Sequence, residues 1–103
     1  MSDTKWRKLI RLVQDGHPDL REVVVKFIDV AEPRRLCFPF WLHPPRPYVD
    51  TYDAGPFALR AIEWMEFPLD LTDLLRMAGR FPLEVQDGRS TITAYACPVR
   101  NVR

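Results

Sequence analysis

The sequence contains few of the residues that support metal or redox chemistry. Its 103 residues include two cysteines and two histidines, which are scattered along the chain. It has no HExxH or CxxC pattern and no glycine-rich phosphate-binding loop. We therefore expect no metal and no bound cofactor, and the sequence assigns no catalytic residue.

Long apolar runs and strong charge imbalance are also missing. No segment approaches transmembrane length, and the first residues do not form a signal peptide. We expect a cytoplasmic protein without membrane contact. The formal net charge is +1, which argues against strong nonspecific attraction to nucleic acid, so we expect weak RNA binding at most. In a reducing compartment, Cys37 and Cys97 are expected to be unpaired thiols buried among apolar neighbours.

Glycine is scarce, with four residues against ten prolines. Five of the prolines fall between positions 33 and 47, which indicates rigid, extended connections in that region. The hydrophobic fraction of 47% is ordinary for a globular protein. The chain length predicts a single domain, residues 1–103, with one core.

The stretch from Gly55 to Pro68 is the one around which we expect the chain to be organised. Its Gly-Pro start, its mostly apolar interior and its terminal proline predict a central strand over residues 57–67. Helix propensity alone would favour a helix here, because alanine, leucine, arginine, glutamate and methionine recur. We choose the strand because its aromatic and β-branched residues favour it.

Glu63 has a special position in this expected strand. Strand alternation places it on one face with apolar residues, namely Leu59, Ala61, Met65 and Phe67. A carboxylate among core side chains needs a fixed partner. We expect Glu63 to be a structural carboxylate paired with an arginine (Arg34, Arg35 or Arg89) or with backbone amides at a bulge.

The same stretch carries a resemblance to a known family. Its pattern, GPF-x-L-x-x-IEW-x-EF, resembles the signature of an uncharacterised family of small bacterial domains. The resemblance supports the strand assignment and implies no activity.

The remaining patterns predict an α+β fold. We expect an N-terminal helix, a strongly twisted antiparallel sheet of about five to six strands, and a second helix before a C-terminal hairpin. This order also resembles Sm-like or SH3-like barrels. The helices are expected at 3–15 and 69–80, and the further strands at 21–30, 36–42 (interrupted at Pro39), 48–52, 82–85 and 90–96, with a tight turn at Asp87-Gly88.

The best candidate for a binding site is the proline-rich region from Phe40 to Tyr48, with Asp50 and Tyr52 following it on the next expected strand. It combines aromatic residues and an arginine with a stiff backbone, and these residue types anchor protein interfaces. The candidate partner-binding residues are Trp41, Arg46, Tyr48, Asp50 and Tyr52. The alternative is that Phe40 and Trp41 are core residues and that the prolines only bridge two strands.

Three functions remain open from the sequence. The first is a small non-enzymatic domain that binds a protein partner or self-associates. The second is an RNA-binding Sm-like domain, which would bring arginines and aromatic residues together on one face. The third is an enzyme of unknown class.

Overall fold

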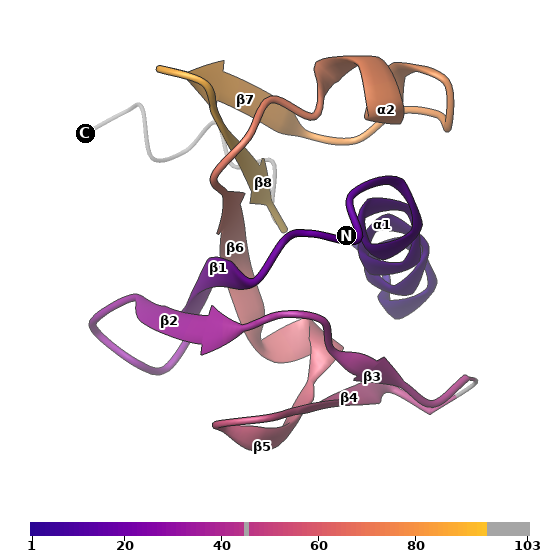
Figure 1. Cartoon of the computed structure of the whole chain (residues 1–103). Helices are drawn as coiled ribbons and strands as arrows, with labels where there is room; N and C mark the ends of the chain where they lie inside the picture. Colours follow the sequence, from indigo (N-terminus) through magenta and orange to yellow (C-terminus); the bar gives the residue numbers. More distant parts are fainter. Residues whose placement is uncertain (45, 95–103) are drawn as a thin grey trace.

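The computed structural model describes residues 1–44 and 46–94 and has an α+β fold. Helix α1 (Asp3–Gly16) lies beside two antiparallel sheets, and the shorter helix α2 (Thr72–Arg76) precedes the last hairpin (Figure 1). The strands are β1 (Glu22–Phe27), β2 (Arg34–Cys37), β3 (Trp41–Leu42), β4 (Tyr48–Thr51), β5 (Gly55–Ala58), β6 (Ile62–Phe67), β7 (Leu83–Gln86) and β8 (Arg89–Thr93).

Helix α1 forms where its amphipathic pattern predicts it. The Ser2 side chain accepts a hydrogen bond from the backbone N–H of Lys5 at 3.1 Å, which caps the first turn. Its apolar stripe is fully buried and comprises Trp6, Leu9, Ile10 and Val13. The burial of this stripe against the sheets leaves the basic residues of α1 on the outside of the fold.

The larger sheet has the strand order β2-β1-β6-β8-β7, so β6 is its central strand as the sequence predicts. Its core face carries side chains from all three middle strands, including Val25, Met65 and Ile92, which are completely buried. The smaller sheet has the order β3-β4-β5 and contributes Val49 to the same core cluster. The core therefore lies between the two sheets and α1.

The predicted strand over residues 57–67 is not one strand. A 3₁₀ turn (Leu59–Ala61) divides it into β5, which belongs to the smaller sheet, and β6, which belongs to the larger one. Leu59 is completely buried, and its backbone N–H donates to the carbonyl of Pro47 at 2.9 Å. That contact fixes the turn, so the chain changes sheets inside an apolar run. The strands form two open sheets and do not close into the barrel of an Sm-like or SH3-like domain.

A β-bulge in β6 decides how Glu63 is oriented. Lys26 pairs with Trp64, but the next residue of β1, Phe27, pairs with Ile62, so Glu63 is the extra residue. The bulge brings Ile62 onto the core side, where it is completely buried. Glu63 itself does not enter the core, because its side chain is 38% exposed.

The partner of Glu63 also differs from the expectation. Its Oε1 atom lies 2.9 Å from Nζ of Lys26, which also donates to the carbonyl of Phe27. Two of the three expected arginine partners pair with other carboxylates: Arg35 with Glu22, and Arg89 with Glu66. The sequence placed no lysine near Glu63 because the pairing of β1 with β6 is not visible in a local pattern.

Two elements are shorter than their sequence patterns predict. Strand β1 ends at Phe27, and Ile28 is 51% exposed in the turn that follows. Helix α2 begins only at Thr72, because Ser90 Oγ binds both the N–H of Leu71 and the carbonyl of Leu69 and so holds that segment outside the helix. The interruption at Pro39 is larger than expected, since β2 and β3 lie in different sheets.

The C-terminal hairpin has the predicted turn. Asp87 and Gly88 both have positive φ angles, 56° and 76°, as a two-residue hairpin turn of this type requires. Leu83 pairs with Ile92 in the expected register. Residues 95–103, including Cys97 and the end of the predicted last strand, lie outside the described part of the chain. Among residues 1–44 and 46–94, no helix is long and apolar enough to cross a membrane.

The contact between Lys26 and Glu63 gives a testable prediction for stability. A double-mutant cycle with Lys26→Met and Glu63→Gln should give a coupling energy of about 1 kcal/mol, because Lys26 is largely shielded from water. The exposed pair of Arg35 and Glu22, at 3.8 Å, is the matched control and should couple by less than about 0.5 kcal/mol. Urea denaturation measures both cycles. Equal coupling in the two pairs would show that the bulge does not hold Lys26 and Glu63 together.

Candidate functional site

The outer face of the smaller sheet gathers most of the predicted partner-binding residues. Val49 and Thr51 of β4 are buried, so the alternating residues Tyr48 and Asp50 point to the opposite side. We call this side the β3–β5 face. It is formed by Trp41, His43, Tyr48, Asp50 and Pro56, with Arg46 and Tyr52 at its two ends.

Hydrogen bonds connect the polar side chains of the β3–β5 face. His43 Nε2 lies 2.5 Å from Oδ2 of Asp50, and the His43 ring stands 5.6 Å from the ring of Tyr48. Nη1 of Arg46 donates to the Tyr48 hydroxyl at 3.2 Å. Trp41 is opposite Asp50 in the strand register. The polar residues therefore hold one another in place beside Trp41.

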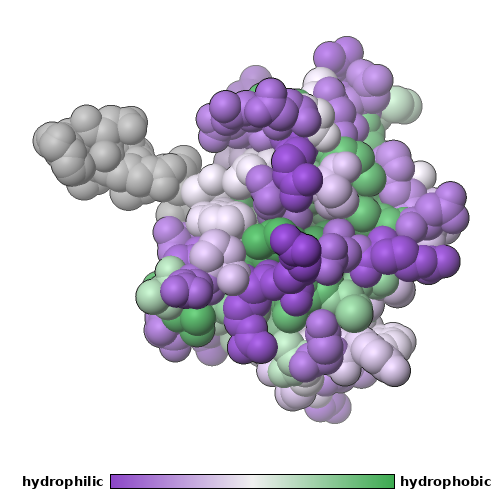
Figure 2. Space-filling model, turned by 60° about the vertical axis from the view of Figure 1, so that its left-hand side comes forward, coloured by the Kyte–Doolittle hydropathy of each residue, from purple (hydrophilic) through white to green (hydrophobic). Residues whose placement is uncertain are grey.

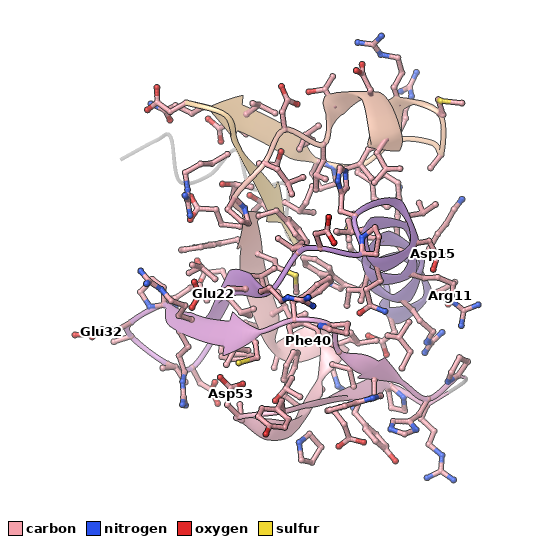
Figure 3. All side chains as sticks on the ribbon, in the orientation of Figure 1. Arg11, Asp15, Glu22, Glu32, Phe40 and Asp53 are labelled. Carbon is pink, nitrogen blue, oxygen red and sulfur yellow. The ribbon has the colours of Figure 1, made fainter. Side chains whose placement is uncertain are left out.

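The aromatic residues of this region divide between core and surface. The Phe40 side chain is 2% exposed and points into the molecule (Figure 3). The backbone N–H of Phe40 donates to Oε1 of Gln14 in α1. Trp41 is 51% exposed and Tyr52 78% exposed. The alternative that both aromatic residues belong to the core is thus right for Phe40 and wrong for Trp41, and the binding role of Trp41 stays a prediction.

The structure brings together Trp41, Tyr48 and Asp50 directly, and Arg46 joins them through Tyr48. Tyr52 lies just beyond β4, in the turn to β5. The sequence reasoning included His43 in the candidate region but did not select it as a contact residue. The signal was present, because His43 follows Trp41 by two residues and two-residue spacing on a strand shares a face.

The pair of His43 and Asp50 has the geometry of a positioned base, but among the described residues no serine or cysteine lies beside it. Ser2 caps α1, and Ser90 is a buried residue of β8. Among residues 1–44 and 46–94, no three His, Cys, Asp or Glu side chains gather closely enough to hold a metal ion. The hydrogen bonds between His43 and Asp50 and between Arg46 and Tyr48 hold these side chains in fixed positions.

The outer face of the larger sheet is polar and largely paired. Ion pairs there join Lys26 with Glu63 and Arg89 with Glu66. Figure 2 shows a surface dominated by hydrophilic side chains, with apolar areas that are small and separated. This side offers no large apolar patch for a partner.

Cys37 lies at the edge of this sheet and is exposed, so the prediction of a buried thiol is wrong for this residue. Its backbone N–H donates to both carboxylate oxygens of Asp53 at 3.3 Å, and Asp53 lies beside the end of β2 (Figure 3). Partial desolvation raises the pKa of the Cys37 thiol, and the negative charges of Asp53 and Glu22 raise it further. A thiol of this kind is a weak nucleophile at neutral pH.

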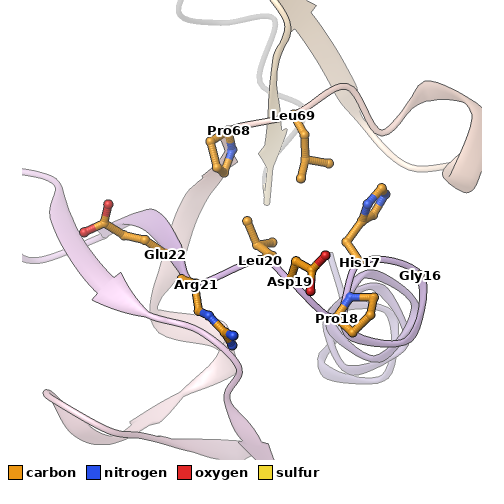
Figure 4. A pocket seen from close by; sticks show the side chains of 9 residues that line it. All are labelled: Gly16, His17, Pro18, Asp19, Leu20, Arg21, Glu22, Pro68 and Leu69. Atoms are coloured by element: carbon orange, nitrogen blue, oxygen red, sulfur yellow. The ribbon is translucent and has the colours of Figure 1, made fainter.

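A cavity lies between the end of α1 and the segment after β6. It has a volume of about 470 Å³. Figure 4 shows its walls, in which apolar side chains from Leu20, Pro68 and Leu69 alternate with His17, Asp19, Arg21 and Glu22. Both signs of charge are present, and Asp19, Arg21 and Glu22 are exposed. The lining selects no single ligand chemistry.

Comparison with protein-family models, with curated proteins and with solved structures finds no match to this chain. The resemblance of residues 55–67 to small bacterial domains therefore stays a prediction. The site must be interpreted from its own geometry.

The raised pKa of Cys37 predicts how its reactivity depends on pH. In a Cys97→Ser background, Asp53→Asn should lower the midpoint pH for alkylation of Cys37, because removal of a neighbouring negative charge favours the thiolate. Glu22→Gln should shift the midpoint in the same direction by a smaller amount, since Glu22 contributes less. Iodoacetamide kinetics between pH 7 and pH 10 measure the midpoints. An unchanged midpoint in Asp53→Asn would contradict the assignment.

Proposed function

We propose that this protein is a cytoplasmic, non-enzymatic interaction domain that binds a partner polypeptide through the β3–β5 face. The observation that carries the proposal is Trp41, which is 51% exposed on a sheet whose neighbouring polar side chains are already hydrogen-bonded to one another. Tryptophan, tyrosine and arginine dominate binding energy at protein interfaces. Trp41, Tyr48, Tyr52 and Arg46 supply all three types.

The fixed geometry of the β3–β5 face supports this proposal. A partner that docks on a mobile surface loses affinity because side chains must be ordered on binding. Here His43 and Asp50 hold each other, and Arg46 holds Tyr48, so part of that ordering has taken place before binding. The exposed ring of Trp41 lies on the edge strand, opposite Asp50, and supplies the apolar anchor beside these ordered groups.

Strong nucleic-acid binding is disfavoured at this face. Asp50 is opposite Trp41 in the strand register, so a base stacked on the indole would bring its phosphates close to a carboxylate. The ring of Tyr48 already contacts His43, and its hydroxyl already accepts a hydrogen bond from Arg46. We therefore place weak or no RNA binding beside the protein-binding function.

A site-specific photo-crosslinker tests the proposal in cells that express the protein. A crosslinking amino acid at Tyr52 should form a discrete adduct, and Trp41→Ala should reduce its yield by about ten-fold or more, because the anchor is lost. The matched control is the same amino acid at Met77, which is 90% exposed at the end of α2, far from the β3–β5 face (Figure 1). The melting temperature of Trp41→Ala checks that the fold is intact.

Three results would contradict the proposed partner contact. Equal adducts from positions 52 and 77, or an adduct unaffected by Trp41→Ala, would show nonspecific capture. A nuclease-sensitive adduct would replace the protein partner by RNA.

An adduct of twice the mass of the chain would identify the partner as a second copy, which is the self-associating form of the same function.

A further inference from the structure

Four strands end a sheet in this fold, and three of these edges carry a feature that hinders pairing with a further strand. The edges are β2 and β7 in the larger sheet and β3 and β5 in the smaller one. At β2, the N–H of Cys37 donates to the carboxylate of Asp53. Beside β3, the N–H of Phe40 donates to Gln14. Strand β5 contains Pro56, which has no N–H. Such features prevent an edge from pairing with another chain.

The register of β7, the fourth edge, shows which of its backbone groups face outward. The N–H of Thr93 donates to the carbonyl of Pro82 at 3.3 Å, so these two residues form a hydrogen-bonded pair. In an antiparallel ladder, such pairs alternate with pairs whose backbone groups point away from the partner strand. By this alternation Glu84 bonds to β8, whereas the N–H and the carbonyl of Val85 point toward the open edge.

The backbone of Val85 has no partner in the described part of the chain. Neither its N–H nor its carbonyl forms a hydrogen bond with another described residue. The Val85 side chain is 37% exposed, and its neighbours Glu84 and Gln86 are also exposed. Strand β7 contains no lysine, arginine or proline, which are residues that commonly protect an edge. The edge of β7 is therefore open to a further strand.

The sequence of β7 is complementary to a second copy of itself. Two β7 strands can pair antiparallel about a two-fold axis at Val85, so that the N–H of each Val85 donates to the carbonyl of the other. In this register Glu84 of one copy lies opposite Gln86 of the other, whose amide can donate to the carboxylate. Arg89, which is opposite Gln86 in its own chain, continues the same row. No two like charges are directly opposite each other.

The opposite edge of the larger sheet lacks this complementarity. The N–H of Phe38 donates to the carbonyl of Arg21, so by the same alternation the backbone of Arg35 faces outward from β2. Two β2 strands paired about Arg35 would place two guanidinium groups opposite each other, which is destabilising. Self-complementarity is therefore a property of the β7 edge and not of the β2 edge.

We propose that β7 is a homodimer contact, through which two copies of this chain join their larger sheets into one continuous antiparallel sheet. The strand is short, so the dimer is weak and depends on protein concentration. The contact does not rest on the proposed function, because β7 and the β3–β5 face lie at opposite ends of the molecule (Figure 1). Each copy keeps that face free, so the dimer presents two of them to a partner polypeptide.

Sedimentation equilibrium of the whole chain tests the contact between about 10 µM and about 1 mM, where weak dimers form. The apparent mass should rise from that of one chain toward that of two. Val85→Pro should raise the dissociation constant by about ten-fold or more, because it removes the N–H of both copies at the axis and no bond to β8. The matched control is Arg35→Pro, at an outward-facing position of β2, which should stay within about two-fold.

A second variant covers the case in which Val85→Pro lowers the melting temperature. Val85→Lys keeps the backbone N–H but places two ammonium groups opposite each other at the axis, so it should also weaken the dimer by about ten-fold. A dimer that tolerates Val85→Lys as well as it tolerates Arg35→Pro would not be formed through β7.

A disulfide crosslink locates the axis. In a Cys37→Ser/Cys97→Ser background, Val85→Cys should form a disulfide between two chains. The Cα atoms of a hydrogen-bonded antiparallel pair are about 5.5 Å apart, within the range of disulfides. Arg35→Cys in the same background is the control for random collision and should crosslink much less.

Four results would overturn the inference. The first is a mass of one chain over the whole concentration range. The second is an equal effect of Val85→Pro and Arg35→Pro on the dissociation constant, and the third is equal crosslinking at positions 85 and 35. The fourth is a dimer that Trp41→Ala disrupts and Val85→Pro does not, which would assign self-association to the β3–β5 face.

Discussion

The fold depends on one apolar segment that has to serve two sheets. Residues 55–67 pair with β4 at one end and with β1 and β8 at the other, so the segment cannot continue as a single straight strand. The buried Leu59 fixes the change of direction, and the bulge at Glu63 restores the core-facing side for β6. Both devices keep apolar side chains inside while the backbone moves from one sheet to the next.

Helix α1 connects the core with the segment that carries β3 and the loop after it. Its buried stripe packs into the core, and its polar side reaches the proline-rich connection at two points. Gln14 accepts a hydrogen bond from the backbone of Phe40, and Arg7 donates one to the carbonyl of Arg46. These contacts bracket β3 and its loop, so the position of Trp41 follows from the packing of α1. A two-residue strand such as β3 would have few other means of being fixed.

Local patterns predicted the elements whose signals are local. The stripe of α1 and the Asp87-Gly88 turn depend on residues close together in the sequence, and both are found where expected. The division of the strand over 57–67, the pairing of Glu63 with Lys26 and the exposure of Cys37 depend on which strands become neighbours. That information is non-local. For the candidate site, two-residue spacing indicates that Tyr48 shares a face with Asp50 and that His43 shares one with Trp41, but the contact between His43 and Asp50 depends on the pairing of β3 with β4.

The distribution of charge explains why the net charge is a poor guide to the character of the surface. A net charge of +1 suggests a surface without preference. The structure instead shows two kinds of charged surface. On the larger sheet, cations pair with carboxylates, whereas no carboxylate of the described residues pairs with Arg7, Lys8 or Arg11 of α1. Exposed ion pairs contribute little to stability and mainly cancel the local field. Cations without a carboxylate partner retain that field, so the net charge of the chain averages over two surfaces of different character.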